Sequence, residues 1–202
     1  MADDEEKENC IEAKGILVGE VGVGKTNLIN VSIGKQFEST TKTTISSNFV
    51  KKYFEIDNEK YIINLWDTAG QEKLKSMTKL FFKGSDIVIY VYDITSENSF
   101  ESLKQWVKET ENLLENQHIC GIVGNKKDLY LEEKVDEKKA KEFADSKGMK
   151  FKLVSAKDDP RSFIDFLEEL LKECRSFISG REKNIFIKEK DGKKEKKNDC
   201  KC

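Results

Sequence analysis

Short apolar runs recur along the chain and predict the strands of a buried sheet. Two of these runs are apolar at almost every position, which is typical of strands that are covered on both faces. A tight turn at residues 57–59 joins two other runs into a predicted hairpin. The strands predicted in this way cover residues 16–18, 49–56, 61–66, 87–92, 119–123 and 151–154.

Between the apolar runs, hydrophobic residues recur at helical spacing. Such stripes are typical of helices that pack one face on a core. We therefore expect these side chains to be core residues and not cofactor contacts. A strand followed by a helix, repeated along the chain, predicts an α/β fold with a parallel sheet and helices on both faces. The two clearest stripes are Phe100, Leu103, Trp106, Val107, Leu113 and Leu114, and Phe163, Phe166, Leu167, Leu170, Leu171 and Cys174.

The two ends of the chain differ from its body in composition. Residues 1–9 are acidic and poor in apolar side chains, and we expect a disordered arm there. Residues 10–178 are expected to form one globular domain. Ser179 and Gly180 are expected to break the last helix, so that residues 179–202 form a flexible tail in which basic residues outnumber acidic ones.

Composition narrows the class of protein. The 202 residues fit one domain, and 36 basic residues against 38 acidic ones give no reason to expect a nucleic-acid partner. The 5 cysteines are scattered and follow no zinc-ligand spacing. We see no signal peptide and no apolar run long enough to span a bilayer. These features favour a reduced, cytosolic protein.

A glycine-rich loop between the first strand and a helix fits the pattern G-x-x-x-x-G-K-[ST]. Its backbone N–H groups and the following helix N-terminus would bind phosphate oxygens. Lys25 would reach the β- and γ-phosphates, and the Thr26 hydroxyl would bind Mg²⁺. The loop predicts a nucleoside triphosphate site without choosing between ATP and GTP. Its residues are Gly19, Glu20, Val21, Gly22, Val23, Gly24, Lys25 and Thr26.

Polar residues that follow the strand at 119–123 indicate which nucleobase the site would bind. In a doubly wound sheet, ligands lie beyond the carboxyl ends of strands. The Asp128 carboxylate could accept hydrogen bonds from guanine N1–H and the 2-amino group, whereas adenine would leave it unpaired. The segment after the last strand could bind the guanine oxygen through backbone N–H groups, although a plain turn explains it equally well by itself. These residues are Asn125, Lys126, Asp128, Ser155, Ala156 and Lys157.

A third motif follows the strand that ends at Trp66. Asp67 can hold a water on Mg²⁺, and Gly70 lets its N–H approach a γ-phosphate. Gln71 can orient the attacking water, and phosphoryl transfer needs little more than such positioning and charge stabilisation. The sequence therefore predicts Gln71, Lys25 and Gly70 as catalytic groups.

In their order and spacing these motifs resemble those of Ras-superfamily GTPases, over residues 14–178. Three features are similar to Rab proteins. They are Trp66 before the Asp67 motif, the stretch from Asp93 to Phe100 that leads into Trp106, and the terminal pair Cys200 and Cys202. The resemblance implies a P-loop G domain with a six-stranded, mostly parallel sheet, an antiparallel second strand and five helices.

The resemblance also implies roles that the bare residues do not. Thr44 would bind Mg²⁺ and sense the γ-phosphate in a first switch at residues 37–48. Phe37 would pack on the guanine, and the GTP site would extend to Asn27. Residues 68–80 would be the second switch, and both switches would order on GTP and loosen after hydrolysis to GDP.

The terminal cysteines alone leave two possibilities, lipid attachment or an accident of a lysine-rich tail. By resemblance, Cys200 and Cys202 each carry a geranylgeranyl group, and two such chains give stable anchoring. Residues 193–197 would add attraction to anionic lipid. Cys10, Cys120 and Cys174 are expected to be buried.

The resemblance further implies a monomer on the cytosolic face of endomembranes that acts as a switch in vesicular trafficking. Its partners would be an exchange factor, a GTPase-activating protein, GTP-dependent effectors, a prenylation escort and a GDP-dissociation inhibitor. Residues 45–49 and 73–75 depart from the usual Rab pattern, which leaves the choice of partner open.

Val21 is a departure that bears on the chemistry, because Ras has glycine there and Rabs often have serine. A branched side chain beside the γ-phosphate could crowd Gln71 or an incoming arginine finger, so we expect slow hydrolysis. Val21 thus favours an alternative function, a GTP-bound scaffold with little hydrolysis, whereas Gln71, Gly70 and Thr44 favour a hydrolysing switch. An ATP-using kinase or transporter subunit is disfavoured by Asp128.

Overall fold

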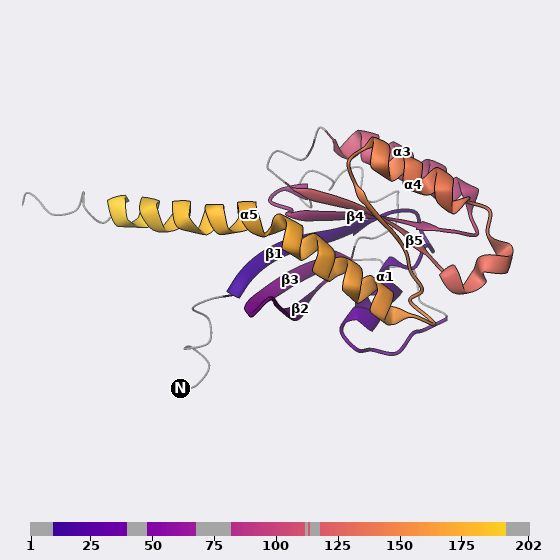
Figure 1. Ribbon diagram of the computed structural model, residues 1–202, viewed down its shortest axis with the longest axis horizontal. Helices are drawn as coiled ribbons and strands as arrows, with labels where there is room; N and C mark the ends of the chain where they lie inside the picture. The colour runs from indigo at the N-terminus through magenta and orange to yellow at the C-terminus, as the bar shows by residue number, and fades with distance from the viewer. Residues whose placement is uncertain (1–9, 40–47, 68–81, 112, 114–117, 193–202) are drawn as a thin grey trace, which may run out of the picture.

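The computed structural model describes residues 10–39, 48–67, 82–111, 113 and 118–192. Its centre is a six-stranded sheet in the order β2-β3-β1-β4-β5-β6 (Figure 1). β2 and β3 pair antiparallel, and the other neighbouring strands pair parallel. The strands are β1 Cys10–Val18, β2 Asn48–Ile56, β3 Glu59–Asp67, β4 Ile87–Asp93, β5 Ile119–Asn125 and β6 Lys150–Leu153.

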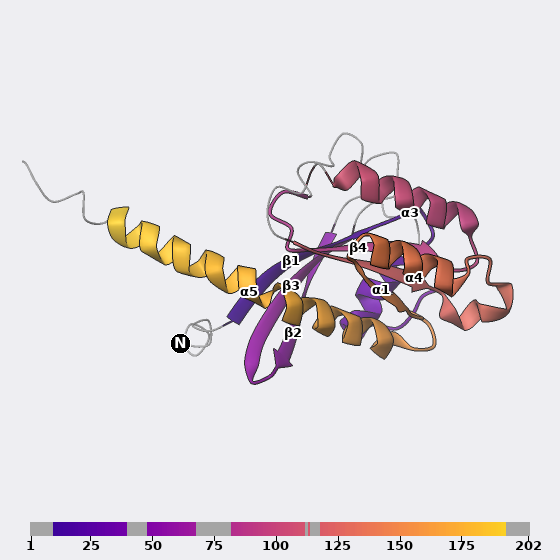
Figure 2. The ribbon, with the colours of Figure 1, turned by 45° about the horizontal axis from the view of Figure 1, so that its top comes forward.

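Helices cover both faces of the sheet (Figure 2). Apolar side chains of α1 and α5 share one core cluster with the sheet, and those of α3 and α4 share a second cluster on the other face. Within the described residues the helices are α1 Lys25–Ser32, α3 Glu97–Thr110, the 3-10 helix η2 Lys127–Glu132, α4 Glu137–Ser146 and α5 Pro160–Gly192. The predicted α/β fold, a six-stranded and mostly parallel sheet with five helices, is confirmed.

The local predictions also agree with the structure. Each predicted strand is present, although β1 begins six residues earlier than the apolar run, at Cys10. The hairpin turn is two residues long, because Ile56 pairs with Glu59, and Asp57 and Asn58 both have positive φ, as a type I′ turn requires. The predicted helical stripes are buried wherever they are described, with Leu113 partly buried and Leu114 outside the described residues.

The predicted end of the last helix is wrong. α5 continues through Ser179 and Gly180 to Gly192, and its outer half leaves the body of the molecule (Figure 1). A glycine inside a helix costs only about 1 kcal/mol, which good helix formers on both sides can offset. The predicted acidic arm and the last ten residues, with Cys200 and Cys202, lie outside the described residues.

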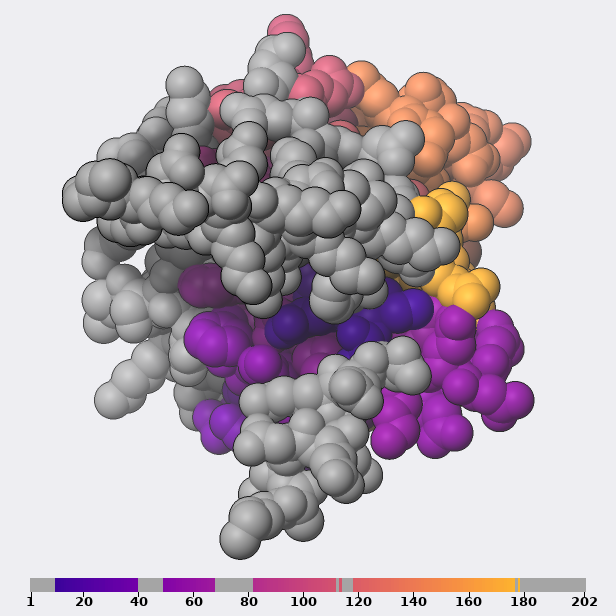
Figure 3. Space-filling view, turned by 90° about the vertical axis from the view of Figure 1, so that its left-hand side faces the viewer, coloured from indigo at the N-terminus to yellow at the C-terminus, as the bar shows by residue number. Residues whose placement is uncertain are grey.

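Ion pairs fasten α5 to the β2–β3 turn. Lys172 Nζ lies 3.4 Å from Asp57 Oδ2, and Arg175 pairs with Glu59. Figure 3, which views the end from which α5 projects, shows α5 next to the purple residues of β2 and β3. Among the helices of the described chain, none is both long and apolar enough to cross a membrane.

The prediction of buried cysteines holds only for Cys174. Cys10 and Cys120 are partly exposed. Both stand at the start of a strand, Cys10 as the first residue of β1 and Cys120 as the second residue of β5. Strand ends lie at the rim of the sheet, where the helices cover less of it.

Candidate nucleotide-binding site

The glycine-rich loop joins the carboxyl end of β1 to the first turn of α1. Gly19 approaches β4 so closely that a Cβ there would lie 2.2 Å from the Val91 carbonyl oxygen. Gly24 is the N-cap of α1 and has φ 97°, a left-handed conformation that side chains disfavour. The loop therefore needs glycine at these positions to bring its backbone around the start of α1.

Lys25 is held inside this loop. Its side chain is buried, with 6% of the residue exposed, and Nζ donates hydrogen bonds to the carbonyl oxygens of Gly19 and Glu20, each at 2.8 Å. Burial lowers the Lys25 pKa to about 8, against the opposing effect of the Asp67 and Glu20 charges. A cation fixed at a helix N-terminus, among backbone amides, is a site for an anion such as a polyphosphate.

Thr26 and Asp67 meet at the next position along the site. The Thr26 hydroxyl donates to Asp67 Oδ2 at 2.7 Å, which joins the first turn of α1 to the last residue of β3. Asp67 is buried and Thr26 is partly buried. A hydroxyl and a carboxylate are oxygen donors of the kind that Mg²⁺ prefers, so this pair fits the predicted magnesium site.

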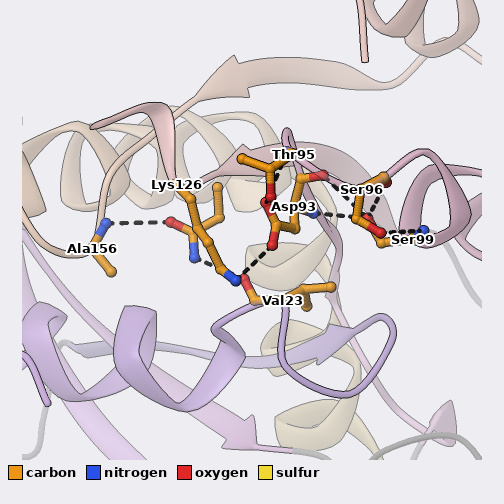
Figure 4. A network of polar contacts seen from close by, with 8 residues as sticks. Val23, Asp93, Thr95, Ser96, Ser99, Lys126 and Ala156 are labelled. Carbon is orange, nitrogen blue, oxygen red and sulfur yellow. Dashed lines mark hydrogen bonds and ion pairs between the residues drawn. The ribbon is translucent and has the colours of Figure 1, made fainter. Parts of the chain in front are cut away.

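Asn125, the last residue of β5, connects three segments. Its Nδ2 donates to the Val23 carbonyl oxygen at 2.8 Å, and its Oδ1 accepts from Ala156 N at 3.3 Å. Figure 4 shows Val23 and Ala156, the two partners of this side chain, with dashed lines for the hydrogen bonds. The buried amide thereby fixes the phosphate loop relative to the two loops that the sequence assigns to the base.

Asp128 lies beside the segment that follows β6. Ser155 Oγ donates to Asp128 Oδ1 at 2.6 Å, and Lys157 Nζ lies 4.0 Å from Oδ2. The Asp128 side chain is only 8% exposed. The predicted base-binding residues, from two loops 27 positions apart, are thus brought together at one edge of the sheet.

Asn27, which the sequence predicts as part of the GTP site, is hydrogen-bonded to the backbone of Glu38. Its Nδ2 donates to the Glu38 carbonyl oxygen at 2.9 Å, and its Oδ1 accepts from Glu38 N at 3.4 Å. Both bonds join the buried side chain to the residue after Phe37, which is exposed. The Asn27 side chain therefore positions the Phe37 segment.

Comparison with known proteins agrees with this geometry. A sequence model of the Ras family matches residues 14–176. The chain is 36% identical to human Ras-related protein Rab-30 over 165 residues, which is 80% of this chain and 81% of that protein. This chain is a Ras-superfamily small GTPase of the Rab family. It is also 35% identical to Ras-related protein Rab-11C of Dictyostelium discoideum over 181 residues, 90% of this chain and 80% of that protein. With Ras-related protein Rab-2B of the same organism it shares 35% identity over 166 residues, 81% of this chain and 82% of that protein.

Rab proteins are GTP hydrolases of vesicle trafficking, and the sequence predicts three further residues for this chemistry. Thr44, Gly70 and Gln71 lie outside the described residues. Val21 lies in the phosphate loop and is 42% exposed. The side chain therefore projects from the loop on which the γ-phosphate is expected.

Sequence reasoning also missed an ion pair of this Rab GTPase. Lys126 Nζ lies 2.5 Å from Asp93 Oδ2, at the end of β4 (Figure 4). In the sequence, Asp93 is only the first residue of a Rab-like stretch, and no contact is predicted for it. The signal that could have found it is its place directly after an apolar strand, where ligands of α/β sheets gather.

Proposed function

We propose that this Rab GTPase is a membrane-attached switch that binds GTP and Mg²⁺ at the site described above and hydrolyses GTP slowly. The proposal rests mainly on the Asn125 side chain, which is hydrogen-bonded both to the phosphate loop and to the segment of Ala156. Such a bridge gives the phosphates and the base a fixed separation, as a nucleotide site requires.

The residues divide into three groups by the part of the ligand that they would hold. The phosphates would lie on the backbone of residues 19–26, with Lys25 as counter-charge. Thr26, Asp67 and Thr44 would hold Mg²⁺, which neutralises phosphate charge. The base would lie among Phe37, Asn125, Lys126, Asp128 and the segment Ser155, Ala156 and Lys157.

Hydrolysis would depend mainly on how the attacking water is positioned relative to the γ-phosphate. Gln71 would orient a water in line with the γ-phosphate, while the Gly70 N–H and the Lys25 ammonium would stabilise the charge on its oxygens. Gln71 need not be a strong base for this step. The reaction is slow because the chain offers no arginine upstream of Arg161 to complete the charge stabilisation.

The membrane-attached form of the proposal rests on Cys200 and Cys202. Lipid on both cysteines would hold the protein on the cytosolic face of endomembranes. An exchange factor, an activating protein, effectors, a prenylation escort and a GDP-dissociation inhibitor are the proposed partners of a monomer.

Val21 favours a second candidate, a GTP-bound scaffold that recruits effectors and scarcely hydrolyses. Its branched side chain is exposed on the phosphate loop, where it would crowd an incoming water or arginine. Both candidates bind guanine nucleotide, so they differ only in the rate of the chemical step.

Guanine specificity can be tested at Asp128. We expect purified protein to release GDP or GTP, and Asp128→Asn to lower GDP affinity by about a hundredfold or more, because the amide offers N–H groups where guanine also has them. The same change should improve binding of xanthosine diphosphate, whose O2 accepts a hydrogen bond. Asp158→Asn, at an exposed position of the neighbouring loop, removes the same charge and serves as the control. Release of adenine nucleotides, or equal losses in both variants, would contradict the assignment.

A further inference from the structure

Asp93 is mounted rigidly at the carboxyl end of β4. Its Oδ1 accepts from Thr95 N at 2.9 Å and from Thr95 Oγ1 at 2.7 Å. Ser99 Oγ accepts from Asp93 N at 3.0 Å, and only 8% of Asp93 is exposed. The second carboxylate oxygen, Oδ2, is 2.5 Å from Lys126 Nζ (Figure 4).

Lys126 is held in an unusual conformation. It has φ 67°, in the left-handed region that residues other than glycine seldom adopt, and it is the N-cap of η2. It lies between Asn125, which bridges the loops, and Asp128. Residues in such conformations persist only where the surroundings determine them, and they gather at ligand sites. A lysine stem is flexible, so the ion pair with Asp93 is what fixes its direction.

The charges around the predicted base pocket balance in pairs. Asp93 faces Lys126 at 2.5 Å, and Asp128 faces Lys157 at 4.0 Å. Guanine is neutral, and a pocket that binds it has no charge to gain from the base. Loss of the Asp93 charge would leave the Lys126 ammonium without a counter-charge, and the Lys126 side chain could then turn away from the base pocket.

We propose that Asp93 is a positioning residue for guanine: it acts through Lys126, whose stem it holds along the base pocket. This inference rests on the proposed guanine site. The competing explanation is that Asp93 only shapes the turn into α3 through Thr95, Ser96 and Ser99. Asp93→Asn separates the two, because an asparagine keeps the Oδ1 acceptor for Thr95 and removes the charge that faces Lys126.

The test is the rate at which a fluorescent GDP analogue dissociates in the presence of Mg²⁺ and excess GDP. We expect Asp93→Asn to speed dissociation by about tenfold, the range of a charge-assisted hydrogen bond. Lys126→Met should speed it at least as much. In the double variant the rate should match that of Lys126→Met alone, because Asp93 has no other route to the base.

Controls keep the outcomes distinct. Thr95→Val removes one bond to Asp93 Oδ1 and should leave the dissociation rate within about twofold of wild type. If Asp93→Asn does not fold, Lys126→Arg tests the inference in its place. Arginine keeps the ion pair with Asp93, so GDP should dissociate more slowly from Lys126→Arg than from Lys126→Met.

Three results would overturn the inference. One is a double variant whose rate is the product of the two single effects, as a merely structural role predicts. Another is an unchanged rate in Asp93→Asn, and a third is equal rates in Lys126→Arg and Lys126→Met. A wild-type protein that binds no guanine nucleotide would refute the proposed function itself, before any variant is compared.

Discussion

Gly24→Ala should disconnect the phosphate loop from the base loop with a single methyl group. A Cβ at Gly24 would lie 2.3 Å from Asn125 Nδ2, the atom that donates to the Val23 carbonyl oxygen at 2.8 Å. Asn125 would have to move, and its contact with Ala156 N at 3.3 Å would weaken as well. Gly24 also has φ 97°, a conformation that alanine adopts only under strain.

The size of the effect follows from these contacts. The left-handed conformation costs alanine about 1–2 kcal/mol. Each of the two hydrogen bonds of Asn125 contributes about 1 kcal/mol. Since the two hydrogen bonds preorganise the nucleotide site, their sum, about 2 kcal/mol, sets the expected loss at roughly thirtyfold in GDP affinity, whereas the cost of the left-handed conformation lowers stability.

GDP dissociation, together with the nucleotide content of the purified protein, measures this loss. Gly148→Ala is the matched control, because Gly148 also has positive φ, at 64°, but a Cβ there meets nothing within 4 Å. That variant should lose about 1–2 kcal/mol of stability without a change in GDP dissociation. A Gly24→Ala protein that keeps its nucleotide, and releases it within threefold of the wild-type rate, would refute the role of the Asn125 bridge.

Two further predictions concern the same site. Asn27→Ala removes both hydrogen bonds to the Glu38 backbone and should raise the GDP dissociation rate about fivefold to tenfold, by loosening the segment of Phe37. Asn30→Ala on the same helix is its control. Equal GDP dissociation rates in the two variants would contradict a role of the Asn27–Glu38 hydrogen bonds in holding the nucleotide. Lys25, with a pKa of about 8 in place of 10.5, must be charged to bind phosphate, so GDP affinity should be full below pH 8 and fall as the pH rises through that value. Titration of GDP binding between about pH 6.5 and pH 8.5, below the range in which guanine N1–H itself deprotonates, checks this, and Lys25→Arg, which stays charged, should show a smaller fall.

The sequence predicted those parts of the site whose residues are contiguous. Lys25, Thr26, Asn125 and Asp128 stand in short motifs directly after apolar strands, and the strands themselves have a clear hydrophobic pattern. The sheet then brings the motifs together at its carboxyl edge, so the site followed from the fold class.

The contacts that sequence reasoning missed join polar residues that are far apart in the chain. Asn27 with Glu38, and Asp93 with Lys126, leave no periodic signal, because a single side-chain bond needs no pattern. The length of α5 was missed for an energetic reason. Gly180 favours a helix end by only a small energy, and the helix formers around it outweigh that cost.

The central claim, a switch that hydrolyses GTP slowly, is tested most directly by single-turnover phosphate release. The protein is loaded with GTP and Mg²⁺ and compared with Gln71→Leu and Val21→Gly. We expect slow release from the wild type, no measurable release from Gln71→Leu, and faster release from Val21→Gly, because the exposed branched side chain no longer crowds the reaction. Release from Gln71→Leu at the wild-type rate would contradict the account. A wild-type protein that releases no phosphate until Val21 is replaced would instead establish the GTP-bound scaffold.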